Sequence, residues 1–249
     1  NDLGRQQFPG QPDGLTIIHY IVNLAAMNGK FECLQQLLEH NELGSQQWPN
    51  KQNGVTIEYY TVVQSAWSGQ YDCLRQLLTR NDLGNQAWPG TPDGWTINHA
   101  AVGQAARHGK FKCLKQLLDQ NDLGNQQWPG KVDGWTIIHF AVLQATRNGQ
   151  FECLKQLVGN NNIGNQAWPG KPDGWTFNHY VITKIPANRK DEKIDMMEYI
   201  KNRLIQAYRR NDSIDNIKKQ IDIFVNDYAF QDIPMLLPDF YSSIYLHDK

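Results

Sequence analysis

The sequence has no long apolar run and no excess of charge of either sign. No segment approaches the roughly 18 consecutive apolar residues of a membrane-spanning helix, and no basic start followed by an apolar run indicates a signal peptide. We therefore expect a soluble, cytoplasmic type of protein without membrane contact. The formal net charge is only -1, whereas nucleic-acid binding usually leaves a basic excess. Nucleic acid is not an expected partner.

Cysteine is scarce, with four residues in the chain. They recur at one spacing, at Cys33, Cys73, Cys113 and Cys153. Equivalent positions in stacked helices lie about 8 to 10 Å apart, beyond the Cα separation of about 7 Å that a disulfide allows. We expect four reduced thiols, each buried on the packed side of a helix.

The residue groupings of an enzyme are also absent from the sequence. It contains no nucleophile with a paired base, no glycine-rich phosphate loop and no metal-spaced cluster. Histidines recur in register, but equivalent positions about 10 Å apart cannot share one zinc ion, whose ligand bonds are about 2.1 Å long. These histidines are His19, His99, His139 and His179. We expect no catalytic residue, no metal and no cofactor.

What the sequence does have is a unit of 40 residues repeated in register. NDLG or a close variant opens each copy, at Asn1, Asn41, Asn81, Asn121 and Asn161. A period of about 20 to 50 residues indicates a solenoid or a propeller. The chain therefore divides into repeats 1–40, 41–80, 81–120, 121–160 and 161–200, and the last diverges where Pro186 ends its first helix.

Periodicity inside the third copy predicts two helices. Apolar residues recur at steps of three and four on both sides of Gly109. They are Ile97, Ala101, Val102 and Ala105 before it, and Phe111, Leu114, Leu117 and Leu118 after it. Thr96 is a suitable N-cap, and Asn121 a suitable left-handed residue after the second helix. The remaining LGNQAWPGTPDG predicts a loop or hairpin.

Two segments carry a family resemblance. DGWTIIHFAV, residues 133–142, and NGQFECLKQLV, residues 148–158, resemble the ankyrin repeat, with its DGxTPLHxAA opening, NGH turn and LEVVKLLL second helix. The resemblance covers nearly all of residues 1–185. Here the first helix is longer by four residues, about one turn, and the loop is longer by three. A helical pair of the HEAT type is the competing fold, but it needs neither a Thr-x-x-His opening nor a Gly-Pro-Asp hairpin.

The resemblance implies an all-α solenoid of five helix-turn-helix repeats with long hairpin loops. We expect it to occupy residues 1–186, and residues 187–249 to form a helical C-terminal cap with an irregular tail. A helix is expected at 194–208, and another after Ser213. Because the first repeat lacks a preceding helix, we expect its outer face to be covered by a longer chain or by a partner.

Two ladders of side chains have alternative interpretations. By the resemblance, each repeated His bonds the capping Thr and a neighbouring loop. The first aromatic ladder, before Pro, favours packing inside the loop, with a binding strip for a sugar or peptide as the alternative; it comprises Phe8, Trp48, Trp88, Trp128 and Trp168. The second either staples the fourth helical residue or contacts a partner; it comprises Leu15, Val55, Trp95, Trp135 and Trp175.

The end of the first helix varies from copy to copy while the core positions barely change. One slot holds Met27, Trp67, Arg107 and Arg147, and the next holds Asn28, Ser68, His108 and Asn148. By the resemblance, this end lines the binding groove. With Trp95, Trp135 and Trp175 of the hairpins, these residues form the expected partner-binding set.

We therefore expect a non-enzymatic, monomeric scaffold that binds another protein. The alternatives are a carbohydrate or peptide binder using the Trp-Pro loops, and the targeting arm of a longer enzyme. The resemblance also associates lengthened arrays with secreted bacterial effectors delivered into host cells.

Overall fold

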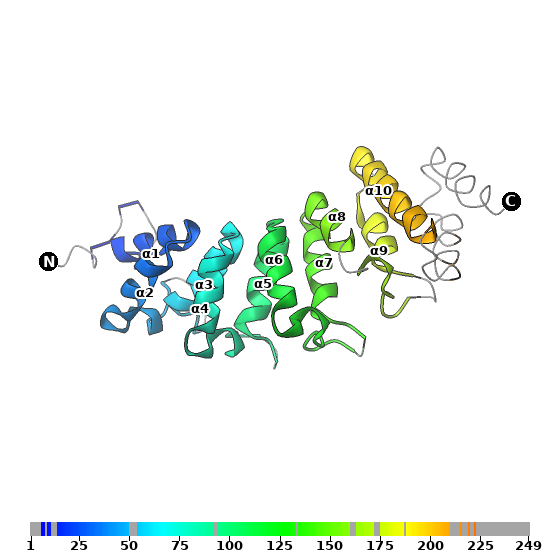
Figure 1. The fold of residues 1–249 in the computed structure, drawn as a ribbon. Helices are drawn as coiled ribbons and strands as arrows, with labels where there is room; N and C mark the ends of the chain where they lie inside the picture. The colour runs from blue at the N-terminus through cyan, green and yellow to red at the C-terminus, as the bar shows by residue number, and fades with distance from the viewer. Residues whose placement is uncertain are drawn as a thin grey trace. The chain divides into compact units, whose positions relative to one another are not determined.

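The chain folds as helical pairs in the computed structural model, which describes residues 6–7, 9–10, 14–49, 54–91, 94–132, 134–159, 163–171, 175–186, 188–209, 215, 219 and 222. Each of the first four pairs is followed by a loop (Figure 1) that contains a short 3-10 segment. The first four pairs are α1 (Ile17–Met27) and α2 (Phe31–Glu39), α3 (Ile57–Ser68) and α4 (Tyr71–Thr79), α5 (Ile97–Arg107) and α6 (Phe111–Asp119), and α7 (Ile137–Arg147) and α8 (Phe151–Gly159). The fifth is α9 (Phe177–Lys184) and α10 (Lys190–Arg209). The predicted all-α repeat fold is confirmed.

The chain comprises two compact units, Asn1–Ala141 and Val142–Lys249. In the first unit, α1 packs against α3 and α3 against α5, while α2, α4 and α6 pack in the same order. In the second unit, α10 packs against both α8 and α9. The expected division at residues 186 and 187 stays a prediction. Within the described part of the chain, no helix has the length and apolarity to cross a membrane.

The repeated Thr and His cap the first helix of each pair. In the third repeat, the Thr96 backbone N–H donates to His99 Nδ1 at 2.9 Å, and the Thr96 hydroxyl lies 2.9 Å from the same nitrogen. The predicted His-to-Thr bond is therefore confirmed, and Nδ1 is an acceptor. Burial lowers the pKa of His99 to about 4, so its imidazole is neutral near pH 7. The same pairing occurs at Thr16, Thr136 and Thr176.

The expected bond from this position to a neighbouring loop occurs in the second repeat, where Tyr59 replaces His. Its hydroxyl donates to Gln86 Oε1 of the next repeat at 3.0 Å. His99 differs, because its Nε2 is buried and has no hydrogen-bond partner among the described residues.

The NDLG motif reverses the chain after each second helix. Asn121 and Asp122 are consecutive left-handed residues, with φ of 48° and 56°. The Asn125 side chain donates to Asp122 Oδ1 at 2.7 Å, and Leu123 anchors the turn in the core. The left-handed Asn121 is thus confirmed. The LGN stretch that we expected to be loop is 3-10 helix, and an isolated bridge between Gln127 and Thr136 closes the hairpin that follows.

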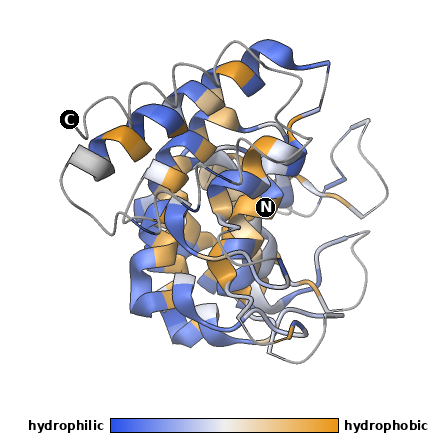
Figure 2. Ribbon diagram, turned by 90° about the vertical axis from the view of Figure 1, so that its right-hand side faces the viewer, coloured by the Kyte–Doolittle hydropathy of each residue, from blue (hydrophilic) through white to orange (hydrophobic). Residues whose placement is uncertain are grey.

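Both hydrophilic and hydrophobic residues occur along the helices (Figure 2), and the buried hydrophobic residues form the core. Most of the predicted core positions of the third repeat are buried, and Phe111 is half-buried. In α10, which begins four residues before the expected helix, Met196, Met197, Ile200 and Leu204 are buried.

One cysteine prediction is wrong. Cys33 is exposed, whereas Cys73, Cys113 and Cys153 are buried. Burial raises the pKa of the Cys73 thiol, and the Glu32 carboxylate of the preceding repeat lies near enough to raise it further. In the first unit, α2 packs against α4, which carries Cys73, and α4 packs against α6, which carries Cys113, whereas within the described residues no such helix precedes Cys33.

Some predicted features lie outside the described residues. They are Phe8 of the Trp-Pro ladder, the tail, and the helix expected after Ser213 except for residues 215, 219 and 222, which are helical.

Candidate partner-binding site

Trp67 lies in the last turn of α3, the first helix of the second repeat, and its side chain reaches the third repeat. Its indole Nε1–H donates to Nδ1 of His108 at 2.9 Å, and the two rings meet edge to face with centroids 5.5 Å apart. The Trp67 side chain nevertheless stays 36% exposed. Burial, with Arg107 and Lys110 nearby, lowers the pKa of His108, which favours the neutral ring that this bond requires. Trp67 is therefore an ordered aromatic surface.

The turns of successive repeats interlock through the residue after each turn glycine. Gln70 Nε2 donates to the Met27 carbonyl at 3.1 Å, and Gln70 packs over Gly29, which has a φ of 66°. Lys110 packs over Gly69 in the same way. A Cβ placed at Gly69 would lie 3.1 Å from Lys110 Cδ, so glycine permits both the left-handed turn and this close packing. We call this series of turns in the first unit, residues 27–30, 67–70 and 107–110, the turn row.

The other predicted residues of the turn row differ in exposure. Arg107 is exposed, and no described residue forms an ion pair with it. Met27 is half-buried, and Asn28 is exposed with its amide donating to the Leu24 carbonyl at 2.8 Å. Ser68 is half-buried, and its Oγ has no hydrogen-bond partner in the part of the chain described. The row thus offers an aromatic face, a thioether and a guanidinium that no described residue pairs with.

In the second unit, the equivalent slots hold Arg147 and Asn148, both exposed. Asn148 donates to the Gln144 carbonyl at 2.8 Å, and Arg147 partly offsets the rise that burial causes in the pKa of Tyr180.

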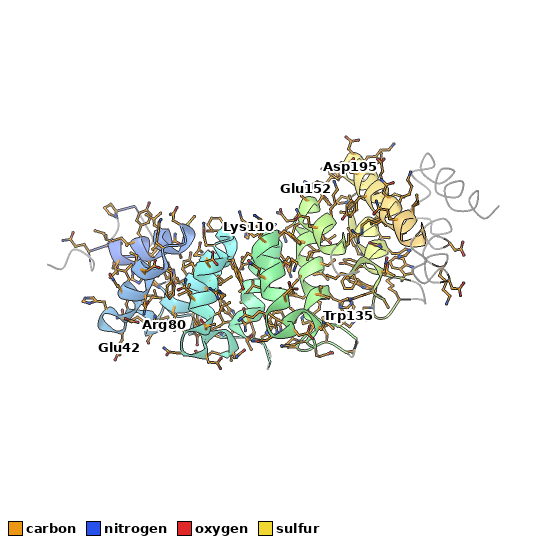
Figure 3. The ribbon with its side chains drawn as sticks, viewed as in Figure 1. Glu42, Arg80, Lys110, Trp135, Glu152 and Asp195 are labelled. Atoms are coloured by element: carbon orange, nitrogen blue, oxygen red, sulfur yellow. The ribbon has the colours of Figure 1, made fainter. Side chains whose placement is uncertain are left out.

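The hairpin tryptophans of the predicted set lie at the opposite end of the helices from the turn row. In Figure 3, Lys110 of the turn row lies on the upper side of the first unit, whereas Arg80 and Trp135 each lie on its lower side. A helix of the length of α5 spans about 16 Å. Trp95 is half-buried against His99 and against Phe140 of the next repeat, with centroids 5.3 and 5.0 Å away. Within the first unit, the structure therefore does not gather the predicted residues into one cluster.

Trp135 and Trp175 are half-buried beside their own histidines, His139 and His179. In the second unit, Lys171 Nζ lies 4.9 Å above the Trp175 ring. Trp95 packs against the following repeat, so an aromatic residue at this position contributes to the packing between repeats. That it also contacts a partner stays a prediction.

The Trp-Pro ladder packs inside the loops. Trp48 stacks on Tyr60 and Trp168 on Tyr180, each with centroids 3.7 Å apart. Trp128 meets Phe140 edge to face at 5.1 Å and is only 8% exposed. Trp88 is half-buried, because the residue that would cover it is Ala100 and not an aromatic. The packing interpretation therefore holds for Trp48, Trp128 and Trp168.

Residues 62–167 match the family model described as ankyrin repeats (3 copies). These residues are ankyrin repeats. The match begins in α3 and ends in the loop before α9, and no curated protein matches the chain. Ankyrin repeats generally mediate protein–protein interaction. Among the residues described, no group of three or more His, Cys, Asp or Glu side chains could hold a metal ion.

Sequence reasoning missed the contribution of Gln70 and Lys110. The residue after the turn glycine varies among the repeats as Lys30, Gln70, Lys110 and Gln150. That variation was visible in the sequence, but only the structure shows that the Gln70 and Lys110 side chains cross to the preceding turn.

Proposed function

We propose that the chain is a protein-recognition scaffold without catalytic activity, and that its first unit binds a partner along the turn row. Trp67 carries this proposal. It is a large aromatic side chain, held in one orientation by His108 and left more than one-third exposed. Aromatic and arginine side chains dominate the binding energy of protein interfaces, and an ordered side chain loses less entropy on binding.

The neighbouring residues support the same surface. Met27 precedes Trp67 in the row, and Arg107 follows it without an ion-pair partner among the described residues. Thioether side chains adapt to varied apolar partners, and a guanidinium can bind a carboxylate through two parallel hydrogen bonds. The row thus combines apolar contact with an unused donor.

Burial argues against the loops as the primary site. Trp48, Trp128 and Trp168 are each less than 10% exposed, so their faces are occupied by neighbouring side chains. A sugar stacked on these rings would have to displace Tyr60, Phe140 or Tyr180. The turn row requires no such rearrangement.

A bait comparison tests the proposal. The full chain, the Arg107→Ala variant and the Trp135→Ala variant are each used to capture proteins from one cell lysate, and the same proteins are applied to a glycan array. We expect a protein captured by the parent chain and by Trp135→Ala, and lost with Arg107→Ala. Capture that is lost only with Trp135→Ala, or glycan binding by the parent chain, contradicts the turn-row proposal.

A further inference from the structure

One segment of the first unit is far more basic than its counterparts. The segment runs from the last residues of the first helix into the first turns of the second helix. Its charges balance in repeat one, where residues 27–35 hold Lys30 and Glu32, and in repeat two, where residues 67–75 hold Asp72 and Arg75. In repeat three, the corresponding residues 107–115 hold no acid. Their cations are Arg107, Lys110, Lys112 and Lys115. The basic character is therefore local, within a chain of net charge -1.

Three of these four cations form no ion pair with a described residue. Lys115 pairs with Asp119 on its own helix. Arg107 and Lys112 are exposed and Lys110 is half-buried, and none of the three forms an ion pair with a residue that the structure describes. Asp72, the exposed acid at the start of α4, belongs to the adjacent repeat. The third repeat therefore keeps three positive groups available.

Two of these cations, Arg107 and Lys110, adjoin the aromatic surface of the turn row. Arg107 and Lys110 flank His108, which accepts the Trp67 indole N–H. Both lie close enough to His108 to lower its pKa. The Lys110 stem also packs over Gly69, two residues after Trp67. A partner segment that contacts Trp67 therefore also meets the positive charges of Arg107 and Lys110 in the third repeat.

Resting on the proposed function, we infer that the partner segment is an acidic peptide that places an apolar side chain on Trp67 and carboxylates on Arg107, Lys110 and Lys112. Charge complementarity identifies the occupant, because carboxylates are the groups in proteins that guanidinium and ammonium groups bind. A nucleic acid would also meet these cations, but its phosphates usually require a longer basic stripe than one repeat supplies.

The test uses a displayed library of random short peptides selected on the intact chain. We expect the enriched peptides to contain Asp and Glu beside an aromatic or aliphatic residue, and their affinity to fall as salt is raised. In the matched variant Arg107→Met with Lys112→Glu, repeat three takes the residues that repeat one has at these positions, and Trp67 and His108 are untouched. This variant should weaken binding about tenfold or more without changing Tm.

A charge-exchanged chain is the control for net charge. It adds Met27→Arg and Glu32→Lys to the matched variant, so the composition of the parent chain is restored with the cations in repeat one. We expect binding to stay lost; recovery in this chain overturns the assignment to repeat three. Comparable, competing binding of single-stranded DNA overturns the assignment to peptide.

Two further outcomes separate this inference from the proposed function. In the first outcome, the selected peptides are not acidic, yet they bind the parent chain and fail to bind Arg107→Ala. This result overturns only the inference that the partner segment is acidic. Peptides insensitive to both Trp67→Ala and Arg107→Ala overturn the proposed function as well.

Discussion

The indole N–H of Trp67 donates to Nδ1 of His108, and this bond joins the turn of the second repeat to that of the third. Of the residues in the same pair of slots, only these two are an aromatic donor and an imidazole acceptor. The bond both orients the exposed ring and contributes to the contact between repeats. Replacing Trp67 therefore alters stability as well as surface, and Arg107, which is exposed and unpaired among the described residues, is the cleaner test of binding.

Acid should destabilise the chain through His99. Because burial lowers its folded-state pKa to about 4, below the ordinary 6.5, its contribution is complete above pH 6.5 and is lost as the pH falls through 4. This loss amounts to about 3 kcal/mol by pH 4. His99→Gln keeps a side chain that can complete a capping box but does not titrate. Urea unfolding from pH 7 to 4 should show a smaller loss for His99→Gln; equal losses would contradict the assignment.

The four thiols should react unequally with an aqueous thiol reagent. Cys33 is exposed and should be labelled rapidly in the folded chain. Cys113 and Cys153 are buried, and burial raises the pKa of each thiol to about 12, so their reactive thiolate is scarce. Mass spectrometry of the labelled sites should find one fast site and three slow ones. Fast labelling of Cys113 would show that the repeats do not pack as described.

Core and surface substitutions should separate clearly in the third and fourth repeats. Leu114 is fully buried, so Leu114→Ala should cost about 2 to 5 kcal/mol. Trp128→Ala should cost about 3 to 5 kcal/mol, because its indole fills the loop interior against Phe140. Arg107→Ala should stay within about 0.5 kcal/mol. Denaturant unfolding measures all three, and equal costs would mean that the helix faces are assigned wrongly.

The left-handed Asn121 gives a test of the NDLG turn. Asn121→Val should destabilise the chain by about 1 to 2 kcal/mol, since a β-branched residue pays a steric cost at a positive φ. Asn121→Gly should be close to neutral, because glycine adopts this conformation freely. Thermal unfolding of the pair measures the difference. If the Val variant is as stable as the Gly variant, the left-handed conformation assigned to Asn121 is contradicted.

The repeat fold could be predicted from the sequence because its determinants recur in each copy. Thr96, Gly109 and Asn121 mark helix ends whatever the tertiary context, and the apolar spacing assigns the buried faces. Contacts made by a single pair of residues leave no such pattern. Neither the bond from Trp67 to His108 nor the position of Lys110 over Gly69 follows from spacing, because each depends on where the next repeat lies.

The candidate site was predicted only in part for the same reason. Variation among copies identified Trp67 and Arg107, but it could not show that Trp95 packs against Phe140 of the next repeat. The uniform burial expected for the cysteines was wrong at Cys33, because burial at that position depends on a neighbouring repeat and not on the helix itself.

The most direct test of the central claim is the affinity of a selected peptide for Arg107→Ala and Trp128→Ala, measured by calorimetry beside the Tm of each variant. If the turn row is the recognition surface, Arg107→Ala weakens binding by more than about 1 kcal/mol at an unchanged Tm, as expected of an interface residue. Trp128→Ala should lower the Tm and leave binding by the folded fraction intact. Loss of binding with Trp128→Ala at an unchanged Tm, with Arg107→Ala silent, would contradict the turn row and assign binding to the loops.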